Sequence, residues 1–255
     1  MASSKDHVLA GAPGECCMRT VQHIGVPRGI AEEIGGINTY ISHSPEKQDK
    51  YDQIILFFPD VFGPFYINTQ LVADYFAGKG YLVVVVDYLE GDPIQANMGK
   101  PGFELFHWAG PKRDRAYELV PKWIEAVKAR YGKSTTKYAA LGYCFGGPDV
   151  LECATSDWIS AAAIAHPAFL NEEHFTTVKR PLFLSCAEID ITFPRDARHR
   201  AEEILVEQKA EYHFQLFSGV RHGFGCRADP EVPRDKWAKE QSALAILSWF
   251  DRFCR

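Results

Sequence analysis

The sequence has no long apolar run, because no stretch approaches the roughly 20 residues that a helix needs to cross a membrane. Its first residues, Met-Ala-Ser-Ser-Lys-Asp-His, lack the charged-then-apolar pattern of a signal peptide. It also lacks an excess of positive charge: 28 Lys and Arg face 33 Asp and Glu, for a formal net charge of −5. Such a charge disfavours nucleic acid and anionic membranes as main partners. We therefore expect a cytoplasmic protein that binds neither nucleic acid nor membrane.

The seven cysteines do not form the pattern of a disulfide framework. Their number is odd, they are spread along the chain, and only Cys16 and Cys17 are adjacent, which favours reduced thiols in the cytosol. Cys16 and Cys17 with His23 are three metal-ligating side chains, but no second pair of ligands follows at the spacing of a zinc finger. We therefore predict no metal site and no other cofactor.

The 255 residues contain no internal repeat, and a chain of this length can bury about three quarters of the surface of its unfolded state. We expect one domain over residues 1–255. Short apolar runs bounded by turn residues recur along it, and most are continuous, as in strands covered on both faces of a sheet. The predicted strands are residues 53–58, 81–86, 137–141, 160–165, 182–185 and 212–217.

Between these runs, apolar residues recur at helical spacing. The predicted helices contain residues 71–76, 116–127 and 197–205, and a last helix begins near Asp235. Strands that alternate with helices predict an α/β fold, with a mainly parallel sheet and helices on both faces. We expect Asn68 to cap the first of these helices, Gly78 to end it, and Pro194 to lie in the first turn of the third helix. In the last helix, Leu244, Leu247 and Phe250 are expected to be buried.

Residues 91–115 interrupt this alternation. They are rich in turn-forming residues, yet they carry the aromatic side chains of Phe103, Phe106 and Trp108. A loop of this length in a compact domain is often a functional lid. The alternative is an irregular surface insertion whose aromatic side chains fill a local gap, and the sequence favours neither.

Cys144 stands where an open parallel sheet binds its ligands, just beyond the carboxyl end of a predicted strand. It follows residues 137–141 and lies between Gly142 and Gly146, in the pattern Gly-x-nucleophile-x-Gly. This nucleophile elbow needs glycines because a sharp strand-to-helix turn brings backbones close together. The helix that follows favours a thiolate. We predict that Cys144 is a nucleophile; the alternative is an inert core thiol.

A nucleophile needs a base, and the base needs an acid that orients it. Asp190 follows the strand at 182–185 and His222 follows the strand at 212–217. Both can therefore meet Cys144 at one edge of the sheet. The chain order of nucleophile, acid and histidine is the order that folds with this elbow use.

Other roles stay open for the acid and the histidine. Asp190 has Glu188 and Asp196 as rivals, and it could cap the following helix instead. Asp196 lies early in that helix, where an acid complements the helix dipole. His222 could be a loop histidine that bonds a backbone carbonyl. The combination of order and position after strands favours the catalytic interpretation.

Motifs in a fixed order run along nearly the whole chain. They are Cys16-Cys17…His23…Pro27-x-Gly29, Phe58-Pro-Asp60-Val-Phe62-Gly63, Ala73-Asp-Tyr-Phe-Ala-Gly-Lys-Gly80-Tyr81, Asp87-Tyr-Leu-Glu-Gly-Asp92, Gly142-Tyr-Cys144-Phe-Gly-Gly147, His166-Pro167 and His222-Gly-Phe. With them the sequence resembles the dienelactone hydrolase family, particularly its fungal-type members. The resemblance implies an α/β-hydrolase fold and a Cys-Asp-His triad that opens an unsaturated lactone. It maps this triad onto Cys144, Asp190 and His222.

The resemblance also implies roles for residues around the triad. The family places a carboxylate that interacts with the nucleophilic thiol after an early strand; bacterial members have glutamate there, and this chain has Asp60. The backbone amides of Val61 and Phe145 would form the oxyanion hole, as the elbow geometry also predicts. A family arginine beyond the histidine binds the substrate carboxylate, and Arg227 is the nearest match, with Arg221 as its rival.

Three further side chains are candidates for substrate binding. His166 follows the strand at 160–165, and either lines the pocket or is a neutral histidine bonded within its loop. Phe103 and Trp108 belong to an aromatic segment that suggests an unsaturated or aromatic small molecule as the substrate.

These features together predict a cofactor-free enzyme, a monomer or homodimer, that hydrolyses a small-molecule ester or lactone through an acyl-thioester on Cys144. Two alternatives stay open. The same cysteine and histidine could isomerise or cyclise a conjugated molecule without net hydrolysis. The chain could also be a non-catalytic domain that binds a small molecule or another partner, although an intact triad argues against that function.

Overall fold

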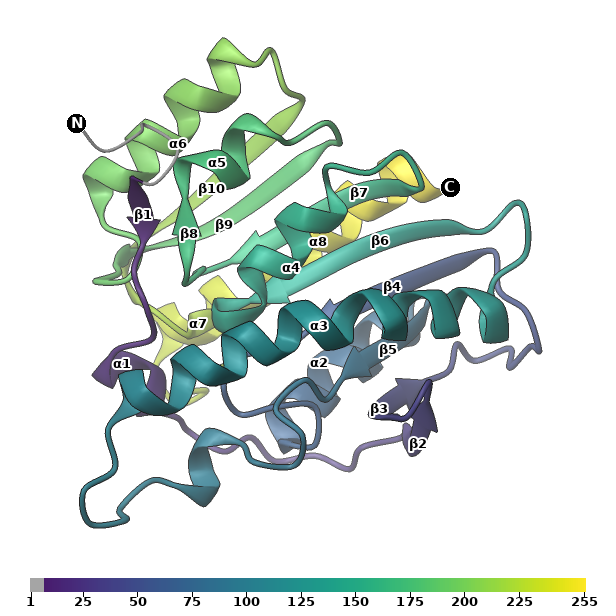
Figure 1. Cartoon of the computed structure of the whole chain (residues 1–255), viewed down its shortest axis with the longest axis horizontal. Coiled ribbons are helices and arrows are strands. Elements are labelled where there is room, and N and C mark those ends of the chain that lie inside the picture. Colours follow the sequence, from purple (N-terminus) through teal and green to yellow (C-terminus); the bar gives the residue numbers. More distant parts are fainter. Residues whose placement is uncertain (1–6) are drawn as a thin grey trace.

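A central sheet of eight strands organises the protein in a computed structural model that describes residues 7–255 (Figure 1). The strands are β2 (Ile30–Ile34), β3 (Ile37–Ser42), β4 (Gln53–Phe58), β5 (Leu82–Val86), β6 (Lys137–Tyr143), β7 (Ile159–Ala165), β9 (Leu182–Ile189) and β10 (Tyr212–Arg221). Their order in the sheet is β10-β9-β7-β6-β4-β5-β3-β2. β3 pairs antiparallel with both of its neighbours, and all other neighbours pair in parallel. The predicted α/β class and the mainly parallel sheet are confirmed.

All six predicted strands are present, and the sheet has two more that the sequence analysis did not identify. β2 reads Ile-Ala-Glu-Glu-Ile, and most of its residues are at least partly exposed. It therefore lacks the continuous apolar run that marks a central strand. β3 and β2 add an antiparallel edge to the parallel core.

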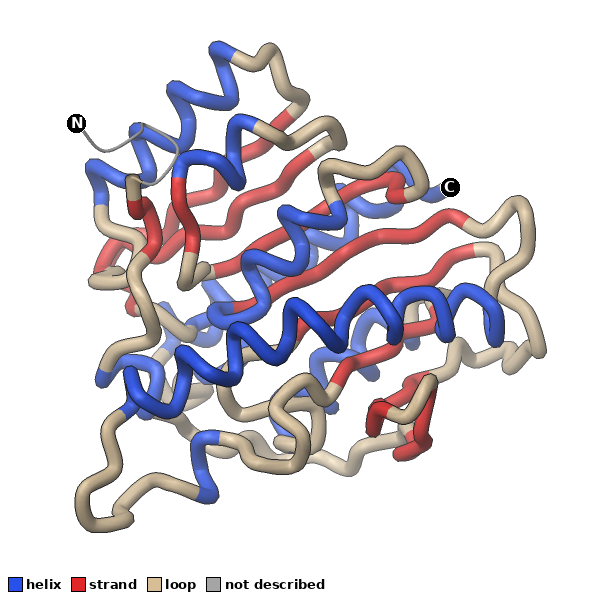
Figure 2. Tube along the Cα trace, in the orientation of Figure 1, coloured by secondary structure: helices blue, strands red, loops and turns tan. Residues whose placement is uncertain are grey.

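Helices cover both faces of the sheet, as the sequence predicted (Figure 2). Alternate residues of a strand point to opposite faces. In β4, Ile55 belongs to one hydrophobic core and Leu56 belongs to the other. Each central strand is therefore buried on both of its faces, which accounts for the continuous apolar runs. The helices on the Ile55 face are α2 (Ile67–Ala77) and α8 (Pro233–Cys254), and those on the Leu56 face are α3 (Leu105–Tyr131), α4 (Gly147–Cys153), α5 (Glu172–Thr176) and α6 (Arg195–Glu207).

Two helix details differ from the prediction. Asn68 does not cap α2, because the helix begins one residue earlier and Asn68 is buried in its first turn. There its amide group donates to the backbone carbonyls of Val21 and Cys226, so tertiary hydrogen bonds take the place of a cap. Leu244 is 49% exposed, because it lies at the rim of a groove between α8 and α2 and not beneath α8.

The irregular segment is shorter than residues 91–115, because residues 105–115 form the first turns of α3. Pro111 lies inside this helix, and the turn-forming character of Gly110 and Pro111 had suggested a loop. The residue four positions before Pro111 is exposed, so its unpaired carbonyl can be hydrated. Phe103 and Trp108 pack edge to face with ring centroids 6.5 Å apart, and the Trp108 indole donates to Asp92. These contacts fit the local-packing interpretation of the aromatic residues.

An N-terminal arm, defined here as residues 7–23, crosses the carboxyl ends of the parallel strands. It contains β1 (Val8–Ala10), which pairs antiparallel with β8 (Leu170–Asn171), and α1 (Glu15–Met18). The backbone of Gly11 hydrogen-bonds to Thr192, which follows β9, and to Phe169, which follows β7. Figure 1 shows this purple segment along the edge of the sheet where those strands end. The sequence analysis did not predict this arm, which places α1 over the edge where the candidate residues gather.

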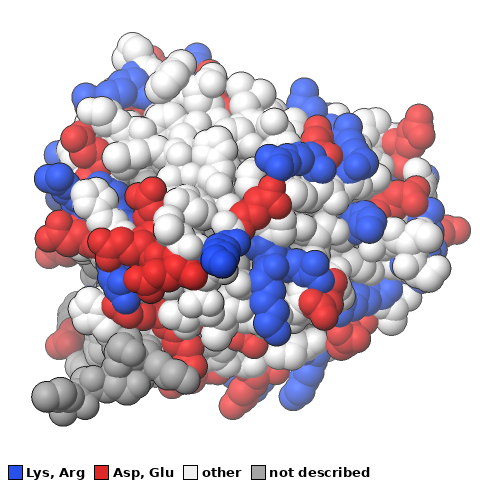
Figure 3. Space-filling model, turned by 90° about the horizontal axis from the view of Figure 1, so that it is seen from above, with Lys and Arg blue, Asp and Glu red and all other residues white. Residues whose placement is uncertain are grey.

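The helices of residues 7–255 include none that is long and apolar enough to span a lipid bilayer. On the face shown in Figure 3, basic and acidic side chains are interspersed. This surface pattern agrees with the modest net charge of the sequence.

Candidate active site

Cys144 occupies a sharp turn between β6 and α4, as the glycine pattern predicted. Its backbone has a φ of 50°, an uncommon left-handed value for a residue other than glycine. A Cβ on Gly142 would lie 2.6 Å from the carbonyl oxygen of Gly146, and a Cβ on Gly146 would overlap the backbone of Phe58 in β4. Both positions therefore need glycine for the turn to pack against its neighbours.

We expect Gly146→Ala to destabilise the protein by about 3 kcal/mol or more, because its methyl group has no room against the β4 backbone. Urea unfolding followed by circular dichroism measures this change. Gly110→Ala is the matched control: it lies in α3 with open space around its Cα, and we expect it to be neutral or to stabilise the helix by about 0.5–1 kcal/mol. Equal unfolding midpoints for Gly146→Ala and the unsubstituted protein would contradict the close packing of the elbow.

His222 and Asp190 meet Cys144 at the carboxyl edge of the sheet. Nε2 of His222 lies 3.2 Å from Sγ of Cys144, and Nδ1 lies 3.0 Å from both carboxylate oxygens of Asp190. The hydroxyl of Thr192 donates to Asp190 over 2.7 Å and lies 2.7 Å from Nδ1 of His222. The side chains of His222 and Asp190 are almost fully buried. The three residues chosen from the sequence therefore form one connected line of contacts.

The electrostatics of this line favour an ion pair between His222 and Asp190. Burial raises the pKa of Asp190, but the charge on His222 and the hydrogen bonds from His222 and Thr192 outweigh burial and hold it near 2. Burial lowers the pKa of His222, but the charges on Cys17 and Asp190 outweigh burial and raise it well above its ordinary value. The imidazolium and the carboxylate therefore stabilise each other.

The alternative roles for the acid and the histidine fit the contacts less well. Asp190 accepts hydrogen bonds from the backbone amides of Thr192 and Phe193, but the N-cap of α6 is Pro194. Asp190 therefore shapes the turn before α6 without capping it. Its rival Glu188 is exposed and contacts Ser218 and Gly219 instead. Both ring nitrogens of His222 contact side chains, whereas its alternative role required a contact with a backbone carbonyl.

Cys17 is a second thiol in this cluster that the sequence analysis did not place there. Its Sγ lies 3.6 Å from Sγ of Cys144 and 3.3 Å from Nε2 of His222. Arg227 donates to the backbone carbonyl of Cys17 over 2.6 Å and holds α1 in position. Cys144 itself has no exposed surface. The only sequence signal was the Cys16-Cys17 pair. His23, the third metal-ligating side chain considered with it, lies elsewhere and contacts the Ala228 carbonyl.

Asp60 differs from its predicted role, because no hydrogen bond joins its carboxylate to Cys144. The carboxylate accepts from the backbone amide of Phe62 and from the thiol of Cys226, and it lies 3.3 Å from Nε of Arg227. The short side chain of Asp60 accepts from the Phe62 amide within the turn that Asp60 begins, and this contact keeps the carboxylate away from Cys144. The burial of the Cys226 thiol and the charge on Asp60 raise the pKa of that thiol well above its ordinary value. In this conformation Asp60 therefore acts on Cys226 and Arg227.

Arg227 is buried beside the triad, and its guanidinium stacks 5.2 Å from the ring centroid of Phe62. Burial lowers its pKa, but the charge on Asp60 outweighs burial and raises it. Nη2 of Arg227 has no hydrogen-bond partner among residues 7–255. Its rival Arg221 is exposed, and both line the same cavity.

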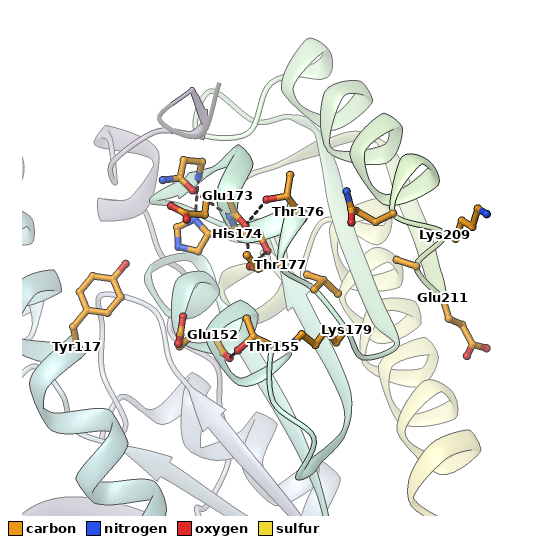
Figure 4. Close-up of a pocket in the computed structure, with 14 residues that line it drawn as sticks. Tyr117, Glu152, Thr155, Glu173, His174, Thr176, Thr177, Lys179, Lys209 and Glu211 are labelled. Carbon is orange, nitrogen blue, oxygen red and sulfur yellow. Dashed lines mark hydrogen bonds between the residues drawn. The ribbon is translucent and has the colours of Figure 1, made fainter. Parts of the chain in front are cut away.

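That cavity has a volume of about 240 Å³ and reaches the triad through His222. Neither Phe103 nor Trp108 lines it. A wider cavity of about 1040 Å³ lies beside α5 and the end of α6, and His174 and Lys179 are among the residues that line it (Figure 4). None of the predicted site residues lines the wider cavity. The smaller cavity is therefore the candidate substrate pocket. Its lining residues are Cys16, Arg19, Thr20, Val21, Ile189, Ile191, Arg221, His222, Gly223, Phe224, Arg227, Ala228, Asp229 and Asp235.

The backbone amides predicted for the oxyanion hole lie beyond two adjacent strands. β4 and β6 pair in register up to Phe58 opposite Gly142. Val61 follows three residues after Phe58, and Phe145 follows three residues after Gly142. Both residues are fully buried beside the elbow. The two amides therefore lie at the same edge of the sheet as Cys144.

His166 agrees with one part of its predicted roles, because it is neutral but is neither a lining residue of the cavity nor bonded within its loop. It does not line the cavity beside His222, and neither of its ring nitrogens has a hydrogen-bond partner within residues 7–255. The ring is fully buried, with its centroid 5.0 Å from that of the His222 ring. Burial lowers the pKa of His166 well below its ordinary value, and the charges on His222 and Arg227 lower it further. His166 is therefore a neutral core histidine. The folded protein would protonate it only at a pH well below the ordinary pKa of histidine.

We expect the stability of the protein to fall below about pH 6.5, by up to about 1.4 kcal/mol per pH unit from His166 alone. The unfolded chain takes up a proton there that the folded chain excludes, so the folded state loses stability as the pH falls. His166→Asn removes this group and suits the backbone φ of 37°, because asparagine tolerates left-handed conformations. Urea unfolding at neutral and at mildly acidic pH measures the slope. An unchanged slope in His166→Asn would contradict a neutral buried histidine.

Comparisons with known proteins identify the family of the chain. The model of the Dienelactone hydrolase family matches residues 37–254. Dienlactone hydrolase 1 of Gibberella moniliformis is 36% identical over 257 residues, which cover 98% of each chain. Hydrolase pyvD of Aspergillus violaceofuscus is 32% identical and covers 95% of this chain and 98% of its own. The solved structure of m3DLH has a TM-score of 0.67 at 19% identity, with 89% of this chain and 97% of its own covered. The family match begins beyond the N-terminal arm, so Cys16 and Cys17 lie outside it.

Proposed function

Because the chain belongs to the dienelactone hydrolase family and is therefore a hydrolase of esters or lactones, we propose that it opens a small-molecule ester or unsaturated lactone with a Cys144–His222–Asp190 triad. The observation that carries this proposal is the distance of 3.2 Å between Sγ of Cys144 and Nε2 of His222, with Nδ1 held 3.0 Å from Asp190. These contacts supply a nucleophile, a base and a group that orients the base.

In the proposed reaction the Cys144 thiolate attacks the acyl carbon, and His222 holds the proton that the thiol has lost. The amides of Val61 and Phe145 would stabilise the tetrahedral oxyanion, each contributing about 3 kcal/mol. As the carbon–oxygen bond of the ester breaks, His222 protonates the leaving oxygen and an acyl-thioester remains on Cys144. His222 then removes a proton from water, which attacks the thioester and restores the thiol. Asp190 holds His222 in the tautomer that both steps need.

The substrate must displace part of the N-terminal arm before it reaches Cys144. Cys144 has no exposed surface, and the side chain of Cys17 covers its sulfur. Cys16 of α1 lines the cavity beside His222, so an outward shift of α1 would join the cavity to the nucleophile. Nη2 of Arg227 would then be a donor for a substrate carboxylate at the same place.

The experiment that tests the proposal is detection of the acyl-enzyme. The protein is mixed with a panel of butenolides and activated esters, quenched in acid, and analysed by intact mass and peptide mapping. We expect the acyl mass on Cys144 and oxygen from labelled water in the released acid. An adduct on a different cysteine would contradict the assigned nucleophile. Product without labelled oxygen would favour isomerisation or cyclisation, and no adduct or product with any substrate would favour a binding domain.

A further inference from the structure

Four soft donor atoms converge at the contact between the N-terminal arm and the triad. They are the sulfurs of Cys16, Cys17 and Cys144 and Nε2 of His222. Cys17, Cys144 and His222 are completely or almost completely buried. Cys16 is half-buried and lines the cavity beside His222. Thiolate and imidazole are the ligands that Zn²⁺ and other thiophilic ions prefer in proteins.

The spacing of three of these atoms, those of Cys17, Cys144 and His222, matches a tetrahedral ion, and Cys16 lies beside them. With Zn–S near 2.3 Å and Zn–N near 2.0 Å, neighbouring sulfurs lie about 3.8 Å apart, and sulfur and nitrogen lie about 3.5 Å apart. The sulfurs of Cys17 and Cys144 are 3.6 Å apart, and Nε2 of His222 lies 3.3 and 3.2 Å from them. The sulfur of Cys16 lies 4.0 Å from that of Cys17, and the ligand atoms of Cys16, Cys17 and His222 all lie within 4.8 Å of one another. Cys144 is not part of that group, so the sulfur of Cys16 must move by about 1 Å or more toward Cys144 before all four atoms can bind one ion.

The second shell of this cluster also suits a metal. A metal-bound histidine almost always donates its other ring N–H to a carboxylate or carbonyl, which fixes the tautomer. Nδ1 of His222 lies 3.0 Å from both oxygens of Asp190, so Nε2 faces the sulfurs. Arg227 donates to the Cys17 carbonyl and so fixes the position of α1, which carries two of the three sulfurs. The cavity that Cys16 and His222 line gives the ion a route from solvent.

We propose that Cys16, Cys17, Cys144 and His222 form a binding site for a thiophilic metal ion, with Zn²⁺ as the ion of matching size and geometry. On binding, each coordinated thiol and the Nε2 atom of the His222 imidazolium lose a proton to solvent, and the three sulfurs and Nε2 bind the ion. The sequence analysis predicted no metal because no second pair of ligands follows Cys16, Cys17 and His23 at the spacing of a zinc finger, whereas the fold supplies His222 and Cys144 from distant segments.

Occupation of this site closes the enzyme. Four protein ligands leave no open position for water or substrate, unlike the three-ligand sites of zinc hydrolases. The ion would also hold the nucleophile and its base and fix α1 over them. We therefore expect Zn²⁺ to inhibit the hydrolase reversibly. This inhibition rests on the proposed function of the triad, whereas the binding of the ion does not.

The test is a metal titration of the full chain under argon with a non-thiol reductant, so that no disulfide forms. Co²⁺ reports ligation through thiolate charge-transfer and tetrahedral d–d absorption, and Zn²⁺ then displaces it in competition with a chromophoric chelator. We expect one ion per chain, with intensities typical of several thiolates. We also expect Zn²⁺ to inhibit ester hydrolysis and excess chelator to restore it.

Single variants separate this site from an ordinary pairing of Zn²⁺ with a cysteine and a histidine. We expect Cys17→Ser to weaken Zn²⁺ binding at least about 100-fold, because loss of a direct ligand costs more than loss of a second-shell partner. We expect Cys16→Ser to weaken binding about 10-fold or more, since its sulfur is the most displaced of the four. Cys153→Ser is the matched control, because Cys153 is buried in α4 away from the cluster.

Each outcome decides the proposal. Zn²⁺ binding that weakens in Cys17→Ser and Cys16→Ser but not in Cys153→Ser supports it. Equal Zn²⁺ affinity in all three variants and the unsubstituted protein would overturn it, as would the absence of thiolate-to-cobalt absorption. If the ion binds as expected but Cys144 forms no acyl adduct, the proposed function fails and the metal site stands. If Cys144 forms the adduct but no ion binds, the metal site alone fails.

Discussion

Replacing Cys144 with alanine is expected to lower kcat/KM for an activated ester by about 10⁴-fold or more while the protein stays folded. The alanine variant keeps His222, Asp190 and the oxyanion amides, so only the covalent step is lost. The elbow backbone already has its left-handed φ at this position, and alanine keeps the same Cβ, so the fold should tolerate the change. Hydrolysis rates and thermal unfolding measured on the same sample check both parts.

Two other cysteines make this result specific. Cys153→Ala removes a buried thiol of α4 and is expected to keep the activity of the unsubstituted protein. The activity of Cys17→Ala should be compared directly with that of Cys144→Ala, because both sulfurs are near the base. The sulfur of Cys17 lies 3.3 Å from Nε2 of His222, and the sulfur of Cys144 lies 3.2 Å from the same atom. If Cys17→Ala abolished turnover and Cys144→Ala did not, the nucleophile would be Cys17 and the elbow would have a structural role.

The central strands and the elbow could be predicted because their cause is local. A strand covered on both faces needs a continuous apolar run, and β4, β5 and β7 consist largely of such residues. The turn at Cys144 needs glycine at fixed positions on either side. By contrast, β2 lies at the sheet edge with two glutamates, and the first turns of α3 contain a proline. Their structure depends on tertiary contacts that no short window of sequence shows.

The same distinction separates the site residues that were identified from those that were missed. Asp190 and His222 follow predicted strands, so their meeting with Cys144 followed from the topology of a parallel sheet. Cys17 reaches them only because the N-terminal arm crosses the sheet edge and Arg227 holds its carbonyl. Asp60 was placed after the correct strand, but its partners depend on side-chain length and on the turn that follows. Side-chain contacts between distant segments are what the sequence pattern could not supply.

Asp190→Asn is expected to lower kcat by about 10²–10⁴-fold, because it changes which ring nitrogen of His222 carries the proton. The asparagine oxygen can still accept from the backbone amides of Thr192 and Phe193, so the turn before α6 keeps its shape. Its amide group can donate to Nδ1 of His222, which leaves the proton on Nε2, facing the sulfur of Cys144. The imidazole then cannot accept the thiol proton. The rate of Cys144 alkylation by iodoacetamide should fall together with kcat.

Thr192→Val separates orientation from charge in the same line of contacts. The Thr192 hydroxyl donates to Asp190 and lies 2.7 Å from Nδ1 of His222, and valine keeps the shape of the side chain without the hydroxyl. Because the carboxylate remains ionised and still faces Nδ1, we expect a smaller loss, about 10-fold in kcat. This corresponds to about 1.4 kcal/mol, close to the lower end of the range for a hydrogen bond to a charged group. If Thr192→Val were as damaging as Asp190→Asn, the hydroxyl and not the carboxylate would set the tautomer of His222. If Asp190→Asn kept full activity, His222 would need no acid, and Asp190 would serve only to shape the turn before α6.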